Sequence, residues 1–319
     1  MIEELLEKQY GLHCLQARKS AVGAGSDTWF VRCAEGEYVL KFPAASEINH
    51  PKLEPELCAF LRTNGVPACD FLKNRAGNYV SADGEGRACT VQRRLPGVTP
   101  EWNAASETVL LESAELLGKI HRVLRDYPAL PEGIGAGFFA HMTPQRAAES
   151  YRRSLAQAAR LGDGESAAEL EWRVGLMERF PEWTFDLGKL TLRNTHGDYF
   201  ISQFLCEQDH LTAVIDWTTA CVHPVVWEIT RSFVYSAPCC ADGRIDEALF
   251  ARYIDAYCRY GTLSEYDRAN LCRLYLYQIA VCDYYGQYYA SAAANREIYL
   301  AQARHATKLL KSMEGKIIR

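Results

Sequence analysis

The sequence changes character close to residue 100, and this change constrains the fold more than any other feature. Before the segment "LPGVTP", short apolar stretches alternate with turns, whereas from Ser106 onward apolar residues recur with helical spacing. A chain of 319 residues can form two lobes, each with its own core. The pattern predicts an α+β protein with a small β-rich lobe at residues 1–95 and a mainly helical lobe at residues 96–319.

The first lobe is predicted to contain a glycine turn between strands. Gly23 and Gly25 precede the apolar stretch "WFV", and the turn "AEGE" leads into "YVLKF". A dinucleotide-binding fingerprint is excluded, because these glycines open a strand rather than a helix and Thr28 replaces the third glycine. We also expect a helix at "LEPELCAFL" and strands at residues 78–82 and 88–95.

The second lobe is predicted to be helical at residues 107–124, at residues 143–162 and from Asp246 to the end. The segment Leu192–Thr218 is the exception. It predicts a loop followed by two short strands, "SQFLCE" and "LTAVIDW", joined by the turn "QDH".

Composition excludes several classes of protein. The formal net charge is -5 and no basic run occurs, so nucleic acid is not an expected partner. We expect no membrane segment and a cytoplasmic location. The twelve cysteines are scattered singly, as is typical of reduced core thiols. The adjacent Cys239 and Cys240 lack the spacing of a zinc site.

Three charged residues interrupt apolar stretches where burial of a charge is costly. Lys41 ends "YVLK", Asp198 lies in "HGDYF" and Asp216 follows "LTAVI". Each has an ordinary structural explanation when taken alone, such as a lysine at a strand end or an aspartate in a turn. Taken together, they match the needs of a magnesium nucleotide, in which a glycine hairpin and a lysine bind phosphates, one carboxylate orients a hydroxyl and another holds the metal.

The motifs resemble those of the aminoglycoside phosphotransferase and choline kinase superfamily. "HGD" at residues 196–198 and "IDW" at residues 215–217 are 18 positions apart, counted from Asp198 to Asp216. A glycine hairpin and "VLK" precede them, and "LGKIHRVL" is similar to the first large-lobe helix of the family. The resemblance implies a bilobal protein-kinase-like fold, with a mainly antiparallel β N-lobe that carries one helix and a mainly α-helical C-lobe.

The resemblance also implies a role for each matching residue. Asp198 is expected to be the catalytic base, Asp216 the main Mg²⁺ ligand and Lys41 the ligand of the α- and β-phosphates of ATP. GTP is the alternative donor. Either Glu54 or Glu56 is expected to pair with Lys41, and Pro55 leaves the choice open.

Further residues follow from the same resemblance. The triphosphate is expected to be covered by Gly23, Gly25 and Ser26, and adenine to contact the backbone of "QRRL", including Arg93 and Leu95. His196 is expected to hold the catalytic loop. Glu228 is expected to tie the following helix to this loop as a structural residue.

One position departs from the family pattern. The family usually places asparagine five residues after the catalytic aspartate as a second metal ligand, whereas this sequence has Gln203. Glutamine carries the same amide oxygen on a longer side chain. Two hypotheses remain open: an active kinase of a small-molecule hydroxyl, or a weak or inactive kinase-like binding or scaffold protein, as in spore-coat relatives.

The acceptor site is expected in the helical lobe, at "CDYYGQYYASAAANREIY". Helical spacing brings four polar or aromatic residues within about one turn of each other: Asp283, Tyr284, Gln287 and Tyr288. Tyrosine-rich helices also pack against each other without binding a ligand. The sequence leaves aminoglycosides, choline or ethanolamine, and homoserine as acceptor classes, and a monomer or a homodimer as the assembly.

Overall fold

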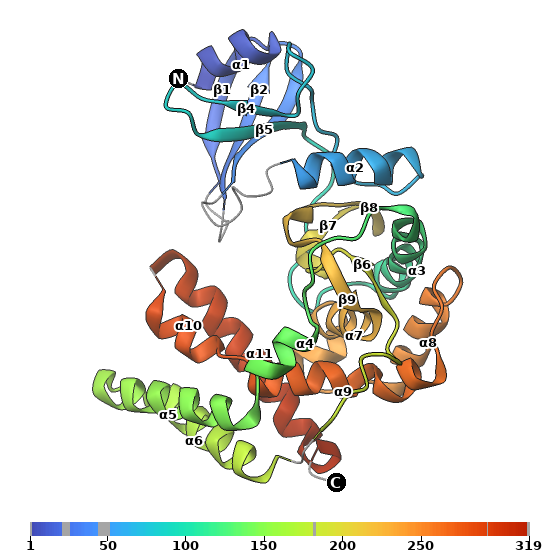
Figure 1. Cartoon of the computed structure of the whole chain (residues 1–319). Coiled ribbons are helices and arrows are strands. Elements are labelled where there is room, and N and C mark those ends of the chain that lie inside the picture. Colours follow the sequence, from blue (N-terminus) through green and yellow to red (C-terminus); the bar gives the residue numbers. More distant parts are fainter. Residues whose placement is uncertain (1, 21–25, 44–51, 181–182, 292, 318–319) are drawn as a thin grey trace. The chain divides into compact units, whose positions relative to one another are not determined.

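The computed structural model describes residues 2–20, 26–43, 52–180, 183–291 and 293–317 (Figure 1). The chain clusters into two compact units. The first unit comprises Met1–Pro100 and Ser202–Ala220, and the second comprises Glu101–Ile201 and Cys221–Arg319. Each unit therefore contains two stretches of chain, and the boundary between residues 95 and 96 stays a prediction.

The first unit is built on a five-stranded antiparallel sheet with the strand order β1-β2-β3-β5-β4. Its strands are β1 (Cys14–Lys19), β2 (Asp27–Cys33), β3 (Gly36–Phe42), β4 (Val80–Ala82) and β5 (Ala88–Arg93). The strands expected at "WFV", "YVLKF", residues 78–82 and residues 88–95 are confirmed. β1 is a further strand, which we did not predict.

The two faces of this sheet differ. One face forms the core with α1 (Ile2–Tyr10), which packs against the sheet (Figure 1). This core includes Leu5, Leu6, Val31, Cys33, Tyr38, Leu40, Phe42, Cys89 and Val91. Successive side chains of a strand point to opposite faces, so Lys41 lies on the face away from this core.

Two other parts of the first unit carry polar residues. The predicted small-lobe helix is α2 (Leu53–Thr63), which contacts the 3-10 turn η3 (Trp217–Thr219). The strands β7 (Phe204–Glu207) and β8 (His210–Val214) form the predicted hairpin. Gln208 and Asp209 between them have positive φ values of 48° and 65°, as a tight two-residue turn requires.

The second unit is mainly helical. Its helices are α3 (Glu107–Val123), α4 (Ala136–His141), α5 (Pro144–Leu161), α6 (Gly164–Arg179), α7 (Val225–Ser236), α8 (Glu247–Tyr257), α9 (Glu265–Val281), α10 (Tyr284–Ala290) and α11 (Ala293–Ile317). Hydroxyl or carboxylate side chains cap several of them, for example Ser106, Thr143 and Asp246. The three predicted helical regions are confirmed, the last as four separate helices.

A two-stranded sheet lies within this helical unit. β6 (Leu192–Thr195) pairs antiparallel with β9 (Cys221–Pro224). The expectation that the segment from Leu192 begins as a loop is therefore wrong for its first four residues. Four residues are too few for a clear alternation, and the partner of Thr195 is 26 positions further along the chain.

The state of the cysteines agrees with the reduced thiols expected from the composition. All twelve cysteines are free. The Sγ atoms of Cys239 and Cys240 are 3.9 Å apart. Within the described ranges, no helix is long and apolar enough to cross a membrane.

Gly118 in α3 permits a close approach of α8. A Cβ atom at this position would lie 2.2 Å from the carbonyl oxygen of Tyr257 and 3.0 Å from the backbone nitrogen of Gly261. Because backbone must move, we expect Gly118→Ala to lower the free energy of unfolding by about 1–3 kcal/mol in urea denaturation. Gly175→Ala in α6 is the control: no atom lies within 4 Å of its new Cβ, and a gain of about 0.5–1 kcal/mol is expected. Equal losses in both variants would contradict this packing.

His223 in β9 is buried in its neutral form. Its Nδ1 atom accepts a hydrogen bond of 2.7 Å from the backbone N–H of Ile134. Burial lowers the pKa of His223 from 6.5 to about 4. The contribution of the neutral His223 ring to stability is complete above the pKa that this histidine has in the unfolded chain. It is lost as the pH falls toward the lower pKa of His223 in the folded protein.

We therefore expect the free energy of unfolding to fall between about pH 6.5 and pH 4, by up to about 3 kcal/mol from this group. His223→Asn keeps an acceptor and should flatten the pH dependence, measured as urea midpoints across this range. The exposed His141 provides the control His141→Asn. An unchanged pH dependence in His223→Asn would refute the assignment.

Candidate active site

Lys41 lies in a cluster of opposite charges in the first unit. Its Nζ atom is 2.8 Å from Oδ1 of Asp216 and 3.5 Å from Oε2 of Glu54. The side chains of Lys41 and Glu54 are 13% and 10% exposed, whereas that of Asp216 is 45% exposed. A lysine fixed in this way can present its ammonium group to phosphate oxygens.

The structure distinguishes the two glutamates that the sequence left open. Glu54 is buried, and its Oε1 atom accepts a hydrogen bond of 3.0 Å from the backbone N–H of Trp217. Burial raises the pKa of Glu54, and the charge of Lys41 opposes this rise. Glu56 is exposed on α2. Glu54 is therefore the partner of Lys41.

The predicted metal ligands Asp216 and Gln203 both belong to the first unit. The hydroxyl of Thr218 donates to Oδ1 of Asp216 at 2.9 Å. The backbone carbonyl of Gln203 accepts a hydrogen bond of 2.9 Å from the N–H of Ile215, the residue before Asp216. Carboxylate and amide oxygens are donors that suit Mg²⁺, so this pair of side chains fits the ion.

Other donors would have to complete the coordination of such an ion. Among the described residues, no group of three or more histidine, cysteine, aspartate or glutamate side chains could hold a metal by itself. Mg²⁺ commonly keeps several waters and binds substrate phosphates together with one or two protein groups. A site with few protein ligands is consistent with this coordination preference of Mg²⁺.

The other predicted nucleotide contacts are only partly described. Gly23 and Gly25 lie outside the described residues, and Ser26 is half-buried just before β2. The backbone N–H of Arg93 donates to the carbonyl of Asp70 at 2.8 Å. An adenine contact in this segment would therefore use other backbone groups, such as those of Leu95. These roles stay predictions.

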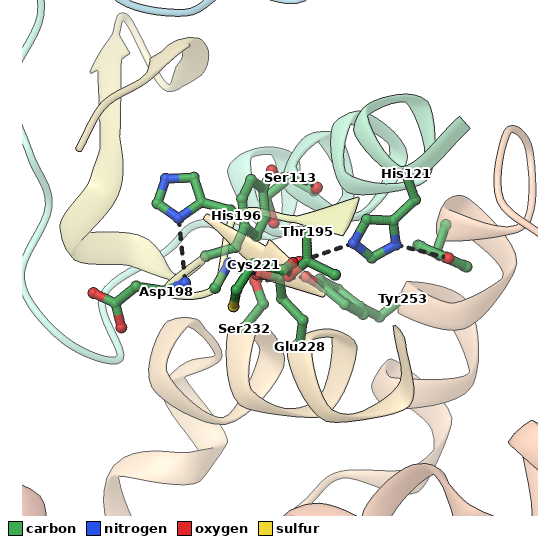
Figure 2. A network of polar contacts seen from close by, with 12 residues as sticks. Ser113, His121, Thr195, His196, Asp198, Cys221, Glu228, Ser232 and Tyr253 are labelled. Atoms are coloured by element: carbon green, nitrogen blue, oxygen red, sulfur yellow. Dashed lines mark hydrogen bonds and ion pairs between the residues drawn. The ribbon is translucent and has the colours of Figure 1, made fainter. Parts of the chain in front are cut away.

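Asp198 lies in the second unit, in the loop between β6 and the short 3-10 turn η2 (Ile201–Gln203). Gly197 has a φ of 79°, which favours glycine, and its N–H donates to Oε1 of Glu228 at 2.6 Å. The N–H of Asp198 donates to Nδ1 of His196 at 3.3 Å, as Figure 2 shows. His196 is fully buried. The loop is thus held by its own histidine and by a glutamate from α7.

Glu228 links this loop to α3. Its Oε2 atom lies 2.8 Å from Nε2 of His121 (Figure 2). Nδ1 of His121 lies 3.0 Å from the hydroxyl of Tyr257. Burial opposes ionisation of Glu228, but the hydrogen bond with His121 and the electrostatic interactions with His121, His196 and His223 together outweigh it and lower the pKa of this carboxyl. The carboxylate therefore remains charged and accepts two hydrogen bonds inside the core.

Asp198 also has an ionic partner on α7. The Nη2 atom of Arg231 is 2.7 Å from Oδ1 of Asp198, and Arg231 is 6% exposed. Arg231 is not among the site residues that the sequence predicts. A charged residue in the apolar helix "HPVVWEITRSFVYS" was an available signal, but its partner could not be read from spacing along the chain.

The four expected acceptor residues do not share one continuous helical face. α9 ends at Val281, and Asp283 caps α10 by accepting a hydrogen bond of 2.9 Å from the N–H of Gly286. Gln287 is exposed, and Tyr288 lies beside the guanidinium of Arg296. Burial raises the pKa of Tyr284 well above the ordinary value. Its hydroxyl also interacts electrostatically with Arg231. The acceptor roles of all four stay predictions.

Comparisons with known proteins show which family and which relatives this chain resembles. Residues 17–272 match the phosphotransferase enzyme family. Homoserine kinase of Methylobacillus flagellatus is 27% identical over 242 residues, which covers 74% of this chain and 68% of that protein. Homoserine kinase of Pseudomonas aeruginosa is 26% identical over 249 residues, which covers 75% of this chain and 70% of that protein.

A solved structure shares the fold. Amicoumacin kinase in complex with AMP-PNP, Ca²⁺ and Ami superposes with a TM-score of 0.65 at 11% identity, covering 100% of this chain and 94% of that chain. The kinase-like α+β fold expected from the sequence is confirmed. Because the family match spans most of the sequence, this chain belongs to the phosphotransferase enzyme family.

Proposed function

We propose that the protein is an ATP- and Mg²⁺-dependent kinase that transfers the γ-phosphoryl group to a hydroxyl of a small molecule. The observation that carries this proposal is the contact of Lys41 with both Asp216 and Glu54. A half-buried lysine held by a helix glutamate, beside a partly exposed aspartate, is the set of groups that nucleotide phosphates and their metal require. GTP is the alternative phosphoryl donor.

In this reaction the acceptor oxygen bonds to the γ-phosphorus while the bond to the bridging oxygen of the departing ADP breaks. Asp198 orients the acceptor hydroxyl and takes its proton. Lys41 binds the α- and β-phosphates, and Asp216 and Gln203 would hold Mg²⁺. When bound, the ion neutralises charge on the phosphate oxygens. Catalysis then depends on positioning and charge rather than on a covalent intermediate.

The acceptor that we favour is a small hydroxy amino acid. The two curated relatives named above are homoserine kinases, and they cover about three quarters of this chain. Aminoglycosides, choline and ethanolamine remain the alternative acceptors. A screen for ADP release should begin with homoserine and include these alcohols.

Asp198→Asn tests the role of the base. The amide keeps an oxygen that can accept the hydrogen bond from Arg231, so the fold is expected to persist. We expect kcat to fall by about 10²- to 10⁴-fold, because the amide cannot take the hydroxyl proton. The exposed Asp255 in α8 provides the control Asp255→Asn, which should keep wild-type turnover. A folded Asp198→Asn protein with wild-type kcat would exclude this mechanism.

A kinase-like protein that binds a ligand without transferring phosphate is the second hypothesis, and Gln203 motivates it. Thermal-shift titration separates the two. Stabilisation by ATP that increases with Mg²⁺ and disappears with a chelator supports the kinase, since binding to the native state raises its stability. Indifference of the melting temperature to both ATP and Mg²⁺ would instead support the scaffold.

Substitution of Gln203 tests its contact with the metal. We expect Gln203→Asn to retain turnover, because the amide oxygen is kept. Gln203→Met, which removes that oxygen, should raise the Mg²⁺ concentration for half-maximal activity by roughly 10-fold or more. Gln157→Met in α5 serves as the control and should not change this concentration. The same Mg²⁺ dependence in Gln203→Met and the wild type would show that the side chain does not bind the metal.

A further inference from the structure

Arg231 is a buried cation enclosed by aromatic rings. Its guanidinium carbon lies 4.3 Å from the ring centre of Phe200, 5.1 Å from that of Tyr235 and 5.6 Å from that of Trp227. Rings attract a cation placed over their faces, but they do not replace the hydrogen bonds of water. A guanidinium in this position therefore depends strongly on any anion within reach.

The anion within reach is the carboxylate of Asp198. Within the described part of the chain, Asp198 is the only carboxylate that forms an ion pair with Arg231, at 2.7 Å from Nη2 to Oδ1. Burial would lower the pKa of Arg231, but Asp198 outweighs it and raises this pKa above the ordinary value. The guanidinium therefore stays charged.

The second amino group of Arg231 is closed to solvent. Nη1 is buried and has no hydrogen-bond acceptor among the described residues. An atom that is closed to water is equally closed to an incoming carboxylate or phosphate. This enclosure argues that Arg231 acts on Asp198 rather than on a bound acceptor.

We propose that Arg231 positions the catalytic base: Nη2 fixes Oδ1 of Asp198, so that Oδ2 is oriented to take the proton of the acceptor hydroxyl. The inference rests on the proposed kinase function for its catalytic consequence. The aromatic enclosure prevents the guanidinium from turning, so the orientation of Asp198 is set by α7 as well as by its own loop.

The expected direction of the pH effect follows from the groups around Asp198. His196 lies in its loop, Arg231 and Tyr235 lie on α7, and Cys221 lies on β9. Burial raises the pKa values of Tyr235 and Cys221 to about 12, so both are neutral near pH 7. Removal of the Arg231 charge should therefore raise the pKa of Asp198 and move the acid limb of kcat/KM to higher pH.

The test compares Arg231→Met and Arg231→Lys with a matched buried arginine. Arg173 is also buried over a tyrosine ring, but its partners are Tyr151, Thr307 and the carbonyls of Ile279 and Ala303. We expect Arg231→Met to lower kcat about 10- to 100-fold, with the acceptor KM unchanged within about twofold. Its acid limb should shift upward by about one pH unit or more, and Arg231→Lys should restore part of that shift.

Arg173→Met should lower the melting temperature without moving kcat or the acid limb of the folded protein. If Arg231→Met behaves like Arg173→Met, then Arg231 is only structural and the inference is wrong. A rise in acceptor KM at constant kcat would make Arg231 a contact of the acceptor and would also overturn it.

A second measurement separates this inference from the proposed function. The Asp198 carboxyl signal, assigned by its loss in Asp198→Asn, can be titrated by carbon NMR in the full chain without turnover. Its pKa should rise by about one unit or more in Arg231→Met. If wild-type protein transfers no phosphate to any alcohol, the kinase proposal fails while this shift still supports the pairing. An unchanged Asp198 pKa would reject the role of Arg231 even in an active enzyme.

Discussion

The buried carboxylate of Glu228 is the constraint on which the second unit depends. A carboxylate with no exposure is tolerated only where both of its oxygens have partners. One oxygen accepts from the N–H of Gly197 and the other is bonded to His121, so α7, α3 and the loop before Asp198 are fixed together. Any displacement of one of these elements would leave a charge without its hydrogen bonds. The position of Asp198 follows from this requirement.

Glu54 is the corresponding buried carboxyl group in the first unit. Its carboxylate contacts Lys41 and accepts from the backbone N–H of Trp217, the residue after Asp216. The helix α2, the strand β3 and the turn after β8 therefore meet at one buried group. Neither Glu54 nor Glu228 is expected to take part in the chemistry. Glu54 fixes Lys41 and Glu228 fixes the loop before Asp198.

Much of this arrangement could be predicted from the sequence, for identifiable reasons. Long periodic segments such as residues 107–124 predict their helices well, and the spacing of Asp198 from Asp216 indicates the family. The choice between Glu54 and Glu56 could not be made, because it depends on how α2 is rotated and which of its sides is buried. β6 escaped prediction because its pairing partner is distant. Arg231 escaped because an ion pair between a loop and a helix leaves no periodic pattern.

The left-handed backbone conformation of Asp216 indicates that its carboxylate has a function in the first unit. Asp216 has a φ of 62°, in the left-handed region, where a non-glycine residue costs on the order of 1 kcal/mol. Neighbouring groups hold this conformation. Thr218 and Lys41 donate hydrogen bonds to Oδ1 of Asp216, and the N–H of Ile215 donates to the carbonyl of Gln203. Glycine would remove the strain but would supply no carboxylate. A strained aspartate beside a half-buried lysine is therefore better explained by a need for that carboxylate than by the turn itself. The same hydrogen bond from Ile215 restricts the backbone of Gln203 next to this turn. The longer side chain of Gln203 therefore starts from a backbone position that this hydrogen bond fixes.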